Sequence, residues 1–127
     1  MLLLKILTPI FNYQAMLKTD KINNVVIVRF DNIDRFNALI TEPVKEDLKS
    51  LFNKPDTRLI LNLEGIRFID SSGFGVFLSI LKTANNNHGQ FKLCNIEPEV
   101  MELFRLLQLH NVFEIHNNLD DCVKSFA

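Results

Sequence analysis

The sequence predicts an α/β fold with a mixed, mostly parallel sheet of about four or five strands and about four helices. Short apolar segments with strand character alternate with single helical patterns along most of the chain. A β-branched run over residues 25–30 follows a candidate edge strand over residues 14–20 and a turn over residues 21–24, which together suggest an opening hairpin. Strands joined through one helix form right-handed parallel crossovers, so the later strands are expected to run parallel.

The remaining elements follow from apolar spacing and from cap residues. Thr41 is the expected N-cap of the first helix, whose apolar residues recur at helical spacing up to Phe52. A nearly continuous apolar run over residues 58–63 predicts a central strand. The later segments predict a helix from residue 76, a strand over 91–94, a helix beginning within 95–98, a strand over 112–116 and a helix capped by Asn118.

Composition and charge narrow the function classes. A chain of 127 residues is expected to form one domain with a substantial core. The net charge of −1 and the scattered basic residues give no electrostatic case for a nucleic-acid partner. Cys94 and Cys122 lie in apolar segments and are expected to be buried thiols, not a disulfide. We therefore expect a cytoplasmic protein with no membrane partner.

The first fifteen residues form an extension of uncertain status, and the domain is expected over residues 16–127. The start of the chain, residues 1–7, is apolar but too short to span a membrane. It also lacks the basic region and the cleavage site of a signal peptide. Three interpretations remain open: a non-native extension, an upstream start before Met16, or a short helix packed on the domain.

The segment over residues 68–76 holds the strongest functional signal, because it places polar residues between a buried strand and a helix. Asp70, Ser71 and Ser72 fall at the helix N-terminus, where Asp or Ser can accept hydrogen bonds from unpaired backbone N–H groups. The helix dipole also favours an anion there, including a phosphate on the protein itself. As a bare string, Asp-Ser-Ser-Gly is more often only a helix cap.

Three neighbouring residues complete this segment. Gly73 and Gly75 are expected where another backbone comes close. Phe74 lies at the junction of loop and helix, where we expect it to be exposed and available to a partner.

The order of strand, loop, Phe-Ile-Asp-Ser-Ser-Gly-Phe-Gly-Val and helix resembles the STAS domain, the fold of bacterial anti-sigma factor antagonists, from about residue 25 to 126. The resemblance implies that the second serine, Ser72, is phosphorylated by a partner kinase. That partner would be an anti-sigma factor that is also a serine kinase with a GHKL-type ATP site. The unphosphorylated protein would bind it and free a sigma factor, and a separate phosphatase would act on phosphorylated Ser72.

One departure from the family pattern affects the loop after the second strand. The family carries a Gly-x-Leu/Ile-Asp turn there, and Ile33-Asp34 fits it, but this chain has no glycine. Asp31 or Asn32 must therefore adopt the tight conformation. Because loops that follow parallel strands meet at one sheet edge, we expect Asp34 near the serine segment.

These placements predict one partner-binding face. Its expected residues are Asp34, Asp70, Ser71, Ser72, Gly73 and Phe74.

The two alternatives to the phosphorylation switch are an enzyme with a serine nucleophile and a subunit of a larger assembly. An enzyme with Ser71 or Ser72 as nucleophile would need a base and an orienting group, yet the chain has no Gly-x-Ser-x-Gly elbow and no histidine placed near the serines, so no enzymatic activity is expected. The three histidines lack metal-ligand spacing, so no metal and no other cofactor is expected. The same fold could also serve as a subunit of a larger assembly, for lipid transport or signalling.

Overall fold

The computed structural model describes residues 16–126, so the interpretations of residues 1–15 lie outside the described part of the chain. Five strands form the main sheet in the order β1-β2-β4-β6-β7. They are β1 (Leu17–Ile22), β2 (Val25–Phe30), β4 (Arg58–Asn62), β6 (Gln90–Cys94) and β7 (Glu114–His116). The β1–β2 pair is antiparallel and the other pairs are parallel, which confirms the predicted mixed, mostly parallel sheet.

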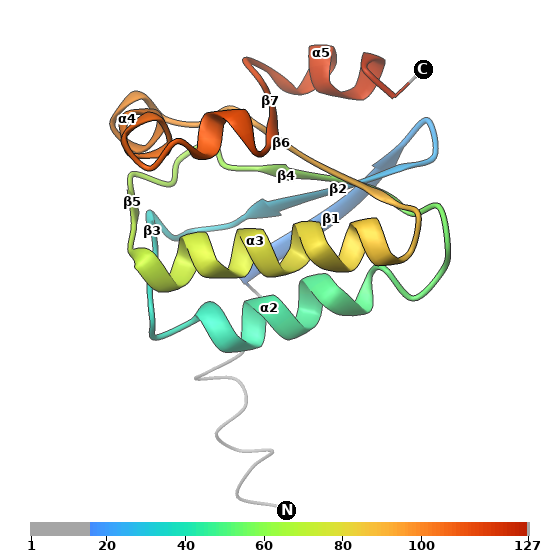
Figure 1. The fold of residues 1–127 in the computed structure, drawn as a ribbon, viewed down its shortest axis with the longest axis horizontal. Coiled ribbons are helices and arrows are strands. Elements are labelled where there is room, and N and C mark those ends of the chain that lie inside the picture. Colours follow the sequence, from blue (N-terminus) through green and yellow to red (C-terminus); the bar gives the residue numbers. More distant parts are fainter. Residues whose placement is uncertain (1–15, 127) are drawn as a thin grey trace, which may run out of the picture.

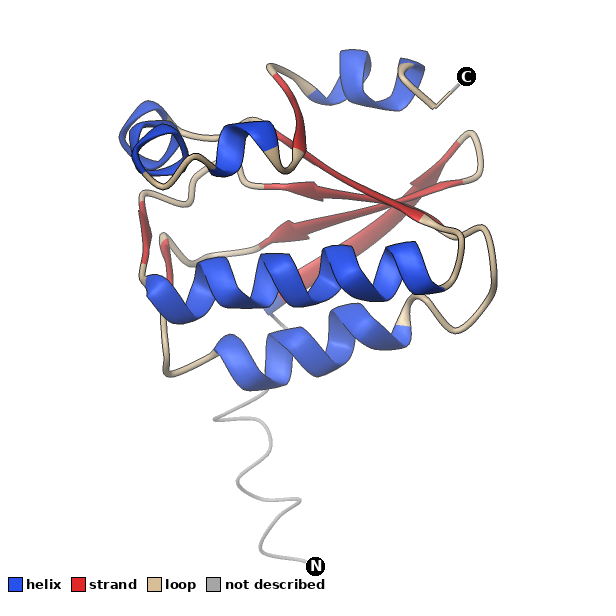
Figure 2. Ribbon diagram, viewed as in Figure 1, coloured by secondary structure: helices blue, strands red, loops and turns tan. Residues whose placement is uncertain are grey.

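Helices cover both faces of this sheet (Figure 1). They are α2 (Thr41–Ser50), α3 (Ser71–Asn86), α4 (Pro98–Leu106) and α5 (Leu119–Lys124), with a short 3-10 helix, η2 (Leu109–Asn111), after α4. The helices α2 and α3 lie side by side below the sheet, and α5 lies on the opposite side (Figure 2). The sheet therefore separates two apolar layers of unequal size.

The larger layer packs α2, α3 and α4 against the sheet, and phenylalanines fill much of it. Phe77 stacks on Phe36 and on Phe104, with ring centroids 5.6 and 6.3 Å apart. The smaller layer lies under α5 and includes the two cysteines, which are free and buried as predicted. Burial of these side chains is the main favourable contribution to folding.

A second, two-stranded sheet brings two loops together, and the sequence did not predict it. The strands β3 (Arg35–Phe36) and β5 (Phe68–Ile69) pair in parallel, with Phe36 opposite Ile69. Each strand has only two residues, too few for an alternating pattern to show in the sequence. This pair fixes the loop after β2 beside the segment that leads into α3.

Three predicted details of the elements are wrong. The helix α3 begins at Ser71 and not at residue 76, so the serines lie in its first turn. Thr41 is not the N-cap of α2. Ile40 is the N-cap, and it makes no side-chain hydrogen bond to the helix. The backbone N–H groups of Ile40 and Thr41 both donate to the Asn37 carbonyl. The last strand begins at Glu114 and not at residue 112. The N–H groups of Val112 and Phe113 donate to the Leu109 carbonyl, which holds them in a turn after η2.

Other local predictions are confirmed. Of the two candidates for the tight conformation, Asn32 adopts it, with a φ of 63°, and Asp31 does not. The turn between β1 and β2 narrows to Asn23 and Asn24, which also have positive φ. Asn118 caps α5 by accepting from the Asp121 N–H.

Candidate functional site

The candidate site is built around Asp70, the N-cap of α3. Its backbone is extended, with φ −92° and ψ −179°, and its Oδ1 accepts from the Gly73 N–H at 3.0 Å. The Ser72 hydroxyl donates to the same oxygen at 2.5 Å. The residue that caps the helix therefore also holds the serine hydroxyl in place.

This hydroxyl also lowers the pKa of Asp70. The hydrogen bond from Ser72 is the main cause that lowers the pKa of the Asp70 carboxyl below 3.8, and the Gly73 and Ala38 N–H groups act in the same direction. Desolvation raises the pKa of this carboxyl, but the hydrogen bonds lower it by more. At neutral pH the group is a carboxylate that accepts hydrogen bonds and donates none.

The second oxygen of Asp70 reaches across to the loop after β2. Its Oδ2 accepts from the Ala38 N–H at 3.0 Å, and the Asp70 N–H donates to the Phe36 carbonyl at 3.3 Å. The Arg67 N–H donates to the Asp34 carbonyl at 2.7 Å. The loop that carries Asp34 therefore lies beside the serine segment, as predicted, although the Asp34 carboxylate itself pairs with its exposed neighbour Arg35 at 3.3 Å.

A third loop supports the same sheet edge. The Gly65 N–H donates to Glu97 Oε2 at 2.9 Å, and Arg67 pairs with Glu99 at 3.1 Å. Both acidic residues belong to the start of α4, which follows β6. Loops after three parallel strands are thus tied together at their carboxyl edge, the usual place for sites in α/β folds.

The two glycines of the motif have different roles. A Cβ on Gly73 would lie 2.6 Å from Ile69 Cγ2 and 3.0 Å from the Phe36 carbonyl oxygen, so this position has no room for a side chain. The predicted close approach is confirmed there. It is wrong for Gly75, where a Cβ would meet nothing within 4 Å.

The predicted exposure of Phe74 is wrong, because this side chain is only 6% exposed. Its ring meets the edge of Phe104 from α4 at 5.1 Å and that of Phe77 at 6.2 Å. The sequence around α3 could not reveal this contact, because the covering ring comes from a helix about thirty residues later. Gly73 is buried too, so it shapes the loop and offers little contact surface.

The exposed residues of this edge overlap only in part with the predicted set. Ser71 and Asp34 are exposed and Ser72 is half-buried, which leaves all three within reach of a partner. The sequence analysis missed two exposed apolar side chains, Leu39 at 82% and Phe68 at 49%.

The position of Leu39 could have been recognised from the asparagine before it. Asn37 Oδ1 accepts from the Leu39 N–H at 3.1 Å, a local turn that holds the leucine outward.

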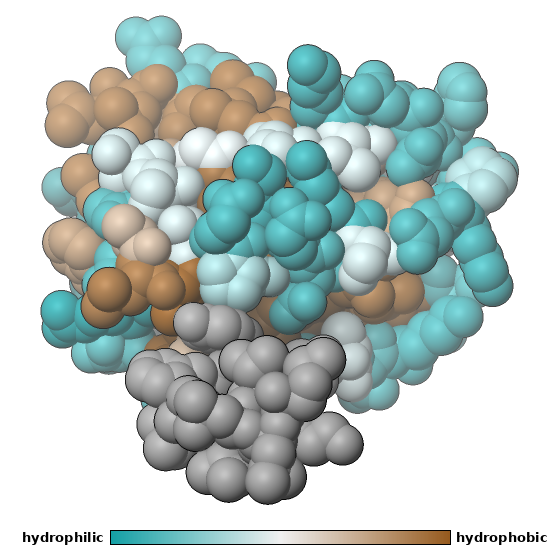
Figure 3. Space-filling view, turned by 90° about the horizontal axis from the view of Figure 1, so that it is seen from below, coloured by the Kyte–Doolittle hydropathy of each residue, from teal (hydrophilic) through white to brown (hydrophobic). Residues whose placement is uncertain are grey.

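Within residues 16–126, no group of three or more metal-ligating side chains lies close enough to hold an ion. Likewise, none of the described helices has the length and hydropathy needed to cross a membrane. Seen from below, the visible surface mixes hydrophilic residues with several apolar patches (Figure 3).

Comparisons with known proteins agree with this architecture. A family model described as the STAS domain matches residues 16–122. BtrV of Bordetella bronchiseptica, provisionally named an anti-sigma factor antagonist, is 26% identical over 110 residues, or 87% of this chain and 93% of the relative.

Two solved structures share the fold. An anti-sigma-factor antagonist (STAS) domain protein of Planctomyces limnophilus has a TM-score of 0.79 at 17% identity, and the match covers 86% of this chain and 96% of that one. The Bacillus cell fate determinant SpoIIAA, in its phosphorylated form, has a TM-score of 0.63 at 16% identity, with 87% and 99% covered.

Proposed function

The chain belongs to the STAS domain family, and from that premise we propose that it is a phosphorylation-controlled protein-binding module with Ser72 as its acceptor. In its unphosphorylated form it binds an anti-sigma factor that is also a serine kinase, and so frees a sigma factor for transcription. A phosphatase that removes the phosphate resets the switch. The name of the relative BtrV supports the anti-sigma partner, and the solved phosphorylated form of SpoIIAA supports the modification.

One observation carries this proposal: the Ser72 hydroxyl donates to Asp70 at the N-terminus of α3, a helix of 16 residues. Phosphorylation replaces the donated hydrogen with a group of about −1.5 to −2 charge beside a carboxylate. The hydrogen bond to Asp70 is lost and becomes a repulsion. The N–H groups of the first helical turn can hold the new anion, so the fold survives while the surface changes.

The proposed partner face has a polar centre and apolar flanks. Asp34, Asp70, Ser71 and Ser72 form the centre, shaped by Gly73. The exposed side chains of Leu39 and Phe68 supply the apolar contact that the sequence analysis had assigned to Phe74. A partner pressed on this face would meet the phosphate directly, and like-charge repulsion or the cost of desolvating the phosphate would weaken the complex.

The assignment of the acceptor is tested with a matched pair of serine variants. Incubation with the kinase that co-purifies with the native protein, and ATP, should add one phosphate to the wild type and to Ser71→Ala, and none to Ser72→Ala. Mass spectrometry maps the site. A phosphate that persists in Ser72→Ala would refute the assignment.

The alternative is a subunit of a larger assembly, for lipid transport or signalling, without a role for a sigma factor. Affinity purification of the native complex separates the two functions. Co-purification of a serine kinase and a sigma factor supports the switch, whereas co-purification of transport or scaffold subunits supports the alternative.

A further inference from the structure

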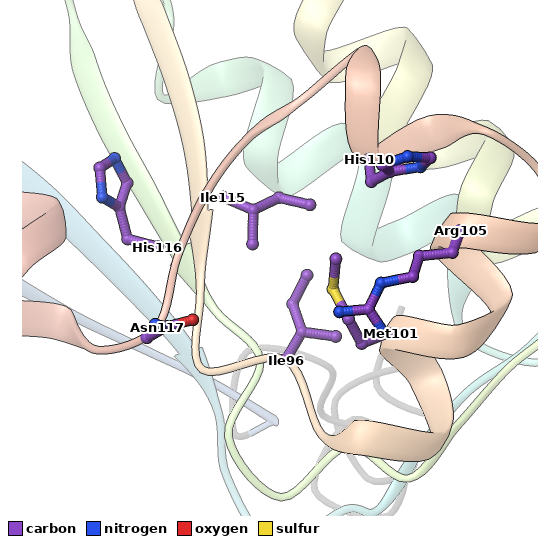
Figure 4. A pocket seen from close by; sticks show the side chains of 7 residues that line it. All are labelled: Ile96, Met101, Arg105, His110, Ile115, His116 and Asn117. Carbon is purple, nitrogen blue, oxygen red and sulfur yellow. The ribbon is translucent and has the colours of Figure 1, made fainter.

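A cavity of about 370 Å³ lies away from the serine segment, between α4 with η2 and the ends of β6 and β7 (Figure 4). Ile96 follows β6 and Asn117 follows β7, so the cavity opens at the carboxyl edge of two adjacent parallel strands. Its volume falls within the range of about 300–1,000 Å³ that is usual for small-molecule sites.

The path of the chain explains why a crevice forms at this place. After β6 the chain turns to α4, which packs with α2 and α3 on the larger layer, as the contact of Phe104 with Phe77 shows. After β7 it turns to α5 on the opposite face (Figure 1). Two neighbouring connections that leave a sheet on opposite sides open a crevice between them, and such crevices are where α/β folds bind ligands.

The lining of the cavity mixes apolar and polar side chains, and Arg105 gives it a positive charge. Ile96, Met101 and Ile115 line it, and Figure 4 shows the Arg105 side chain extending beside Met101. His116 and Asn117 complete the lining with His110, so no acidic side chain lines the cavity.

Two polar groups of this lining lack partners. Within residues 16–126, Arg105 forms no ion pair. In the same part of the chain, the buried Nδ1 of His110 has no hydrogen-bond partner. Arg105 is exposed, so its guanidinium is accessible to a ligand. The buried Nδ1 of His110 is the less usual case, because buried polar groups without partners are uncommon.

We propose that this cavity binds a small organic acid with one carboxylate and an apolar body. The Arg105 guanidinium presents the fork of donors that matches a carboxylate, and it is the only formally charged side chain of fixed sign in the lining. The three apolar side chains would cover the body of the ligand. A polyphosphate fits poorly, because Arg105 alone cannot compensate several charges. This site is independent of the proposed switch at Ser72.

The test is an NMR titration of the ¹⁵N-labelled full chain with octanoate, octan-1-ol and inorganic phosphate. Octanoate should shift the amide signals of Ile96, Met101 and Ile115 in a saturable manner. Octan-1-ol should bind about tenfold or more weakly, because it lacks the charge for Arg105. Phosphate, which lacks an apolar body, should leave these signals unchanged.

Three variants assign the contacts. Arg105→Gln should weaken octanoate binding about tenfold or more without changing that of octan-1-ol, whereas Arg35→Gln, at an exposed arginine outside the cavity, should change neither. Ile96→Trp should fill the space and reduce binding of both. Circular dichroism confirms that each variant is folded. Unchanged amide signals with millimolar octanoate, or equal binding of octanoate by wild type and Arg105→Gln, would overturn the proposal.

Discussion

The N-termini of α3 and α5 have the same type of cap but differ in the other contacts that the cap residue makes. At α5, Asn118 accepts from the Asp121 N–H at 2.8 Å and donates to the Asp121 carboxylate at 3.1 Å, so the cap closes on itself. At α3, Asp70 accepts from its own first turn, from the Ser72 hydroxyl and from Ala38 in another loop. The cap of α5 contacts only its own first turn. The cap of α3 also contacts the loop after β2 and the Ser72 hydroxyl.

The charges of the two first turns differ as well. Asp120 and Asp121 already occupy the first turn of α5, whereas α3 has no acidic residue there. An added anion would meet two carboxylates in the first turn of α5, whereas at α3 it would meet only the N-cap carboxylate of Asp70, so the dipole of α3 is less fully compensated. The comparison favours α3 over α5 as the place of the proposed phosphate.

The largest effect on stability is expected at the third helical residue, which is Gly73 in α3 and Asp121 in α5. Gly73→Ala should destabilise the protein by about 1–3 kcal/mol, because its Cβ would overlap Ile69 and the Phe36 backbone. Gly75→Ala, in open space two residues later, is the matched control and should gain about 0.5–1 kcal/mol from helix propensity. Urea unfolding measures both. Equal effects of the two variants would show that β3 and β5 do not pack against α3 as described.

A smaller effect is expected from removing the caps. Asn118→Ala should cost about 0.5–2 kcal/mol, the usual range for a side-chain cap. Asp70→Ala should cost more, because it also leaves the Ala38 N–H and the Ser72 hydroxyl without their partner. Thermal unfolding of the two variants ranks them. A smaller loss for Asp70→Ala than for Asn118→Ala would mean that the loops are held by other contacts.

The smallest expected effect is on acid titration. Because the Ser72 hydrogen bond is the main cause of the lowered pKa of Asp70, Ser72→Ala should move that pKa up towards 3.8. A carboxyl with a depressed pKa stabilises the fold above its unfolded pKa and loses this contribution as the pH falls through its folded pKa. In the wild type, this contribution to stability should therefore be lost only as the pH falls below about 3.8, and at lower pH than in Ser72→Ala.

Side-chain carboxyl NMR, recorded as a function of pH, follows Asp70 directly in both proteins. Identical titration midpoints would show that the serine hydroxyl does not control the charge of its neighbour.

The sequence predicted the sheet, the helices and the cap at Asp70, because apolar periodicity and cap residues are local signals. It also placed Asp34 beside the serine segment, which follows from parallel topology alone. The short pair of β3 and β5 and the burial of Phe74 could not be predicted in this way. Both depend on contacts between residues about thirty positions apart, and neither leaves a periodic trace in the chain.

The cavity beside α4 illustrates the same limit. Ile96, Arg105 and Ile115 each fit an ordinary role in their own element. Only the opposite directions of the connections after β6 and β7 bring them around a common space.

The most direct test of the central claim is the affinity of the anti-sigma partner for the two forms of Ser72. Calorimetry should be done with unphosphorylated protein, with protein phosphorylated at Ser72, and with Ser72→Ala. We expect the wild type and Ser72→Ala to bind similarly, and the phosphorylated protein to bind about a hundredfold or more weakly, because like charges across an interface cost several kcal/mol. Circular dichroism should show that the phosphorylated form stays folded, since the N-terminus of α3 accommodates the anion. Equal affinity of a folded, fully phosphorylated protein would contradict the switch.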